Sequence, residues 1–201
     1  MGNVIKKTAL ITLLSLVAVL LISVFGVTVF APSFAGDCYF ELGLKNVAVS
    51  CYERAFNDSG SFSDLVELVD SASFSENDEI TATYGKKMID RSIEFAEFCK
   101  SADEDSQGGY STYDYYATLV TFAFYDLGDK EGAVDICFKT LDNGGYTDGC
   151  ALKTAVQLAR EDREFGEVLI SAYKELPSRN FANNTQVQFK KDMRELGYAI
   201  S

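Results

Sequence analysis

The chain has 201 residues, with 30 acidic and 18 basic side chains, no histidine and no tryptophan. The absence of histidine excludes Ser-His-Asp and Cys-His nucleophile arrangements and every histidine-ligated metal site. A net charge of −12 repels phosphate backbones, so we expect no nucleic-acid partner. No nucleophile–base pair or metal cluster stands out, and we expect a protein that is not an enzyme.

The chain begins with an apolar segment. Residues 9–31 carry no charge, Lys6 and Lys7 precede them, and Asp37 follows. A helix over this stretch is long enough to cross a bilayer, and the positive-inside rule then leaves the N-terminus in the cytoplasm. This predicts a short cytoplasmic N-terminus at 1–8, a transmembrane signal-anchor helix at 9–31 and an extracytoplasmic domain at 32–201, at the cell surface or in the periplasm. A cleaved signal peptide is the competing interpretation, which the length of the apolar run disfavours.

Residues 36–55 are predicted to form two antiparallel helices that pack closely. Small and aromatic residues recur there at helical spacing and would meet between the two helices. The facing positions are Gly36, Tyr39, Phe40, Gly43, Ala48, Tyr52 and Ala55.

Further helices are predicted along the rest of the chain. Apolar periodicity indicates a short helix at 63–69 and a long one at 75–102, which Gly85 kinks or divides. A third hairpin follows from about residue 112 to 141, in which Phe124, Gly128 and Ala133 occupy the places of Tyr39, Gly43 and Ala48 in the first. A fourth helix pair is expected at 150–160 and 165–176, and a final helix at 187–196 with a charged outer face.

The order of glycine, aromatic and alanine residues in 36–55 resembles the tetratricopeptide repeat (TPR), a helical hairpin of about 34 residues. Pro32, Ala35 and Gly60 depart from that pattern at its ends. The resemblance implies an all-α fold, a right-handed superhelix of about four TPR-like hairpins with a C-terminal capping helix, preceded here by one transmembrane helix. It also implies a non-catalytic scaffold or adaptor that binds a protein or peptide partner.

The segment 103–114 is similar to the calcium loop of EF-hands. Its oxygen-bearing side chains at ligand positions are Asp103, Asp105, Gln107, Ser111 and Asp114. Gly108 stands at the position of the sharp turn, while Gln107 and Tyr110 depart from the pattern. A calcium-binding or cell-surface module is therefore the alternative function, and an acidic connection that binds no ion is the simpler interpretation.

Tyr113, Tyr115 and Tyr116 are the candidate partner-binding residues. Neighbouring positions on one helix cannot all point inward, so at least one of the three is expected on the surface. Exposed tyrosines often dominate protein interfaces. The alternative is that these rings pack between repeats.

The five cysteines, Cys38, Cys51, Cys99, Cys137 and Cys150, form no CxxC pair. The simplest interpretation is that they are small buried apolar residues. A bridge between Cys38 and Cys51 across the first hairpin is the alternative.

Overall fold

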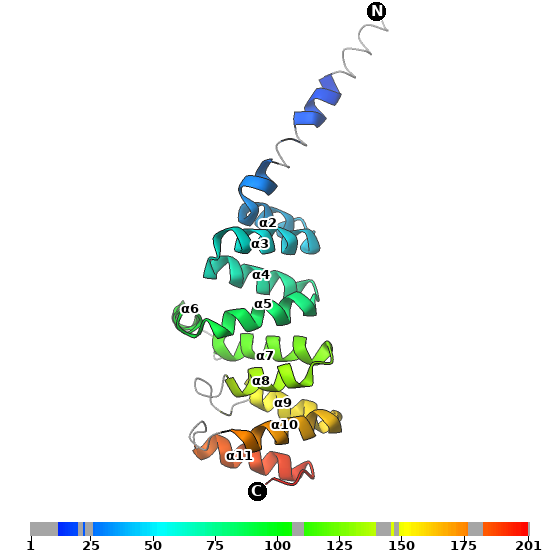
Figure 1. Ribbon diagram of the computed structural model, residues 1–201. Helices are drawn as coiled ribbons and strands as arrows, with labels where there is room; N and C mark the ends of the chain where they lie inside the picture. Colours follow the sequence, from blue (N-terminus) through cyan, green and yellow to red (C-terminus); the bar gives the residue numbers. More distant parts are fainter. Residues whose placement is uncertain are drawn as a thin grey trace, which may run out of the picture. The chain divides into compact units, whose positions relative to one another are not determined.

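The computed structural model is built of helices throughout the part of the chain that it describes, residues 12–19, 22, 26–105, 111–139, 146, 149–176 and 183–200 (Figure 1). No strand occurs among these residues, and within each compact unit the helices pack against one another. The predicted all-α fold is therefore confirmed. The chain divides into two compact units, Met1–Ser75 and Glu76–Ser201. Their boundary lies inside the predicted domain 32–201, whose limits stay a prediction.

The first unit contains α2 (Pro32–Glu41), α3 (Lys45–Ser59) and α4 (Phe62–Phe74), of which α2 packs on α3 and α3 on α4. Between α2 and α3 the chain reverses at Gly43, whose φ of +74° lies in the left-handed region that favours glycine. The N–H of Gly43 donates to the Phe40 carbonyl, and that of Leu44 donates to the Tyr39 carbonyl. These bonds cap α2 in the Schellman manner.

Gly36 brings α2 close to α3. A Cβ at this position would lie 2.8 Å from the ring of Tyr52, which is closer than a carbon contact permits. The Tyr52 ring thus packs on the bare backbone of α2, and its hydroxyl donates to Asp37 at 2.6 Å. The predicted packing of an aromatic ring against a small residue is confirmed at this pair.

The second unit contains the helices that follow Ser75. They are α5 (Asp78–Asp90), α6 (Ser92–Asp105), α7 (Thr112–Asp126), α8 (Lys130–Lys139), α9 (Ala151–Glu161), α10 (Arg163–Glu175) and α11 (Asn183–Glu195).

The turn between α7 and α8 repeats the turn between α2 and α3. Gly128 has a φ of +79°, and the Asp129 N–H donates to the Phe124 carbonyl as the Leu44 N–H does to Tyr39. Ala133 follows Gly128 at the distance at which Ala48 follows Gly43, and both alanines are completely buried. The predicted correspondence between the two hairpins is confirmed in backbone geometry.

The single long helix predicted at 75–102 is wrong, because this stretch forms two separate helices, α5 and α6 (Figure 1). The break lies at Arg91 rather than at Gly85. Gly85 lies inside α5, where a Cβ would overlap the side chain of Val120 on α7. The lack of a side chain at Gly85 lets α5 pack closely on α7. Arg91 has non-helical dihedral angles, and α6 starts directly after it.

The core of the second unit lies between α8, α9, α10 and α11. Phe165, Leu169, Phe189 and Met193 are completely buried there. The chain's C-terminal end joins this core: the Tyr198 hydroxyl donates to the Ala159 carbonyl at 2.6 Å and occupies the space left by Gly166. Tyr198 therefore contacts both α9 and α10.

The predicted transmembrane helix at 9–31 is described only at 12–19, 22 and 26–31, and its other residues lie outside the described part. Among the described residues, no helix combines the length and apolar composition that a bilayer crossing requires. This finding overturns the predicted single-pass topology, with its cytoplasmic N-terminus and extracytoplasmic domain.

All five cysteines are free thiols, and all but Cys38 are buried. Cys38 lies on the exposed side of α2, so the alternative bridge to Cys51 is not formed. The interpretation as small buried residues holds for the other four.

Replacing Ala48 with leucine tests the packing of the first hairpin. The site is completely buried, so three added carbons must displace neighbouring side chains, which costs about 1–3 kcal/mol of folding free energy. Thermal unfolding of Ala48→Leu should therefore occur at a lower temperature. Ala96→Leu, at an exposed site on α6, is the control and should leave the melting temperature unchanged. Equal melting temperatures for both variants would contradict the assigned packing.

Candidate peptide-binding site

A groove of about 520 Å³ lies between α8 and α10 in the second unit. Its apolar floor is made by Val134, Phe138, Val168, Ala172 and Leu176. Glu131, Asp135, Ser171 and Glu175 form its polar edges. An apolar depression with a few polar groups at its edge is the usual form of a binding site in proteins.

The groove arises from matched spacing on two helices. On α8 the lining residues are Glu131, Val134, Asp135 and Phe138. On α10 they are Val168, Ser171, Ala172 and Glu175, and Leu176 directly follows the helix. Both sets recur at i, i+3, i+4 and i+7, which places each on one face of its helix. Each stripe extends about 10 Å along its helix.

Lys130 aligns the two helices that form the groove. Its ammonium group lies 2.7 Å from the Asp162 carboxylate and 2.8 Å from that of Glu164, so the start of α8 is held beside the start of α10. Asp162 also caps α10 by accepting from the Phe165 N–H at 3.0 Å. The hydrogen bond from Lys130 and the cap together lower the pKa of Asp162. The two helices therefore start together and run side by side along the groove.

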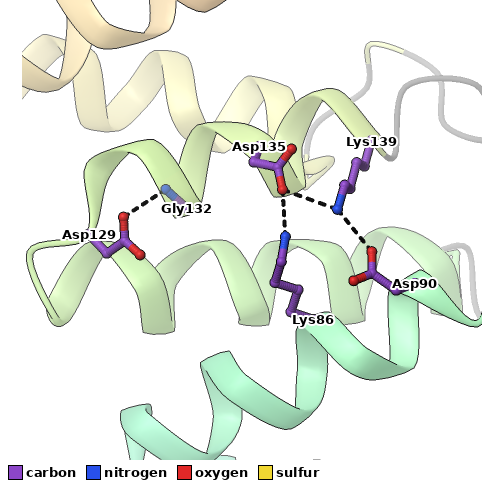
Figure 2. A network of polar contacts seen from close by, with 6 residues as sticks. All are labelled: Lys86, Asp90, Asp129, Gly132, Asp135 and Lys139. Atoms are coloured by element: carbon purple, nitrogen blue, oxygen red, sulfur yellow. Dashed lines mark hydrogen bonds and ion pairs between the residues drawn. The ribbon is translucent and has the colours of Figure 1, made fainter.

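Asp135, at the groove edge, also belongs to an ion network that joins α8 to α5 (Figure 2). Its carboxylate lies 2.6 Å from the Lys86 ammonium and 3.1 Å from that of Lys139. Lys139 in turn lies 2.9 Å from Asp90. Burial alone would raise the pKa of Asp135, but the hydrogen bonds from the two lysines outweigh it and leave the pKa below its usual value. The charge of Asp135 is thus largely balanced within the protein.

The predicted partner-binding tyrosines take different positions. Tyr113 and Tyr116 are buried, with ring centroids 4.8 Å and 6.2 Å from that of Phe95 on α6. Tyr115 is 47% exposed, and its ring packs edge-on against that of Tyr116, with the centroids 5.0 Å apart. Of the three, Tyr115 alone presents a large area to a partner, while the partner-binding role of all three stays a prediction.

Phe122 extends the exposed surface of α7 beyond Tyr115. It is 41% exposed and lies seven residues after Tyr115, hence on the same face of the helix. Phe122 was not among the predicted partner-binding residues. The seven-residue spacing of two aromatic side chains was the signal that could have found it.

The predicted calcium loop is only partly covered by the structure. Asp103 accepts from the N–H of Thr112 at 2.8 Å, and burial, then the charge of Asp103, raises the pKa of Asp114. Gln107 and the side chain of Asp105 lie outside the described residues. Within the described part, no group of three acidic or cysteine side chains is placed to hold a metal ion. Calcium binding by Asp103, Asp105, Gln107, Ser111 and Asp114 stays a prediction.

The buried thiols do not have the character of nucleophiles. Burial raises the pKa of both Cys99 and Cys137 to about 12, so both are protonated at neutral pH. Cys137 instead donates to the Ala151 carbonyl at 3.4 Å. These cysteines contribute to packing between helices.

No protein-family model matches the sequence, and no curated protein matches it either. The resemblance to TPR proteins therefore rests on the residues and on the local geometry of the hairpins.

Substitutions at Tyr115 and Tyr116 distinguish an exposed side chain from a buried one. Tyr116→Ala removes a buried ring that packs on Phe95 and Phe98, so we expect a loss of about 3 kcal/mol in unfolding free energy. Tyr115→Ala should cost clearly less, because nearly half of that side chain faces solvent. Urea unfolding of both variants measures the difference. Similar losses at the two sites would show that the assigned orientation of α7 is wrong.

The ion network at Asp135 makes a prediction about pH. A carboxylate with a lowered pKa stabilises the fold above its unfolded pKa of about 3.9 and loses that contribution as the pH falls through the folded value. Asp135→Asn should therefore cost stability at pH 7, about 0.5–1 kcal/mol because the partly exposed pairs are screened by solvent, and this cost should shrink as the pH falls below the unfolded pKa. Thermal unfolding across this range measures the effect, with Glu97→Gln on the surface of α6 as the control. A cost that does not change with pH would contradict an ionic role for Asp135.

Proposed function

We propose that the protein is a non-catalytic scaffold that holds a peptide segment of another protein in the groove between α8 and α10. The observation that carries this proposal is the groove itself. The groove has a volume of about 520 Å³ and an apolar floor. The ion pairs of Lys130 hold the starts of its two helices, α8 and α10, beside each other. A rigid apolar depression between helices suits the side chains of a bound helix or extended segment.

The proposal includes a TPR-like repeat as the architecture of the chain. The matched left-handed glycines, Gly43 and Gly128, and the matched buried alanines, Ala48 and Ala133, support it. Repeats of this kind stack into a superhelix with a continuous binding surface, and we include that stacking in the proposal. Tyr115 and Phe122 on α7 would offer a second contact surface for the same partner.

The side chains that line the groove favour binding over catalysis. They are carboxylates, one serine and apolar groups, and the sequence supplies no histidine to activate Ser171 as a nucleophile. Apolar side chains next to carboxylates instead suit a ligand whose apolar groups become buried and whose charge is selected by the carboxylates.

Blocking the groove tests the proposal. Ala172 is half-buried in the floor, and Ala172→Arg would fill the groove while its charged end reaches solvent. A phage library of 12-residue peptides is selected on the full-length chain, and the affinities of the selected peptides are measured by fluorescence polarisation. We expect Ala172→Arg to weaken binding at least tenfold.

Ala96→Arg is the matched control, because it adds the same side chain at an exposed site on α6. It should leave the affinities unchanged, and both variants should unfold at the temperature of the unmodified protein. Selected peptides that bind Ala172→Arg as tightly as the unmodified chain would refute the groove as the binding site. A selection that yields no peptide would refute the function.

A further inference from the structure

The edges of the α8–α10 groove carry an unbalanced negative charge. Glu131 lies near the start of α8, Glu175 lies at the end of α10, and both side chains are exposed. Neither carboxylate forms an ion pair with a described lysine or arginine, and no described basic residue lines the groove. The two free charges thus stand on opposite walls, toward opposite ends of the apolar floor.

Asp135 differs from these two glutamates. Two lysines within 3.1 Å already satisfy its carboxylate, and they connect it to α5 (Figure 2). Glu131 and Glu175 have no such partners among the described residues. They are therefore the edge charges that are available to a ligand.

We infer that the groove selects a cationic amphipathic segment, with apolar side chains on the floor and a lysine or arginine beside each of Glu131 and Glu175. This inference rests on the function proposed above and specifies the chemistry of the partner. The floor is about 10 Å long, which matches apolar side chains at i, i+3, i+4 and i+7 over two turns of a helix. The net charge of −12 over the whole chain would attract such a segment before contact.

Charge complementarity predicts a particular order of affinities. An acidic peptide would place like charges next to Glu131 and Glu175, while a neutral peptide would leave both carboxylates without a partner. A basic peptide forms one exposed ion pair at each end. Each such pair is screened by solvent, so we expect the two together to change the affinity by about fivefold to tenfold.

Three synthetic peptides test the inference. They share leucine and phenylalanine at helical spacing and carry lysine, glutamine or glutamate at the flanking positions. Fluorescence polarisation with the full-length chain at 50 mM salt should show that the lysine peptide binds most tightly and the glutamate peptide most weakly. Raising the salt to 300 mM should weaken the lysine peptide and leave the glutamine peptide nearly unchanged.

Substitutions at the groove edge test whether Glu131 and Glu175 cause the preference for the lysine peptide. The double variant Glu131→Gln/Glu175→Gln should reduce the affinity for the lysine peptide about fivefold to tenfold and leave that for the glutamine peptide unchanged. Glu97→Gln, at an exposed glutamate on α6, is the charge control and should have no effect. The reversal Glu131→Lys/Glu175→Lys should make the glutamate peptide the tightest binder. Thermal unfolding establishes that each variant is folded.

The outcomes separate this inference from the proposed function. If the lysine and glutamine peptides bind equally and Ala172→Arg weakens both, the groove binds peptides but the cationic preference is refuted. If the lysine peptide binds Ala172→Arg as well as the unmodified chain, its attachment lies elsewhere and the inference fails. If Ala172→Arg weakens the binding of none of the peptides, the proposed function fails as well.

Discussion

The structure depends on the sharp reversal of the chain between paired helices. At Gly43 and Gly128 the backbone enters the left-handed region, and a Schellman bond from the following residue caps the first helix of each pair. An L-residue with a side chain would be strained there. Because the turn is so short, the second helix starts beside the end of the first, and small residues such as Gly36 and Gly85 then permit close contact within each unit.

The groove follows from this arrangement together with one set of ion pairs. Lys130 holds the start of α8 beside the start of α10, while α9 and α10 share a core built around Phe165. The outward faces of α8 and α10 then form two parallel stripes with the same spacing.

Part of the fold and of the candidate site could be predicted from the residues. The pairing of Gly36 with Tyr52 and the equivalence of Gly43 with Gly128 are visible as spacing, because each hairpin is local in sequence. The exposure of at least one of the three tyrosines followed from helical geometry alone. The break at Arg91 could not be predicted, since Gly85 looked like the weaker point until its contact with Val120 was known. The groove could not be predicted either, because in the sequence its apolar residues look like ordinary buried positions of a helix.

The sequence by itself determined the helical hairpins, their tight turns and the acidic character of the chain. These properties arise from residues within a few positions of one another and from composition. Only the tertiary structure decided that Val134 and Phe138 meet Val168 and Ala172 at a groove, and that two lysines neutralise Asp135 while Glu131 and Glu175 stay available. These features depend on contacts between helices far apart in the chain, and local periodicity carries no information about which faces come together.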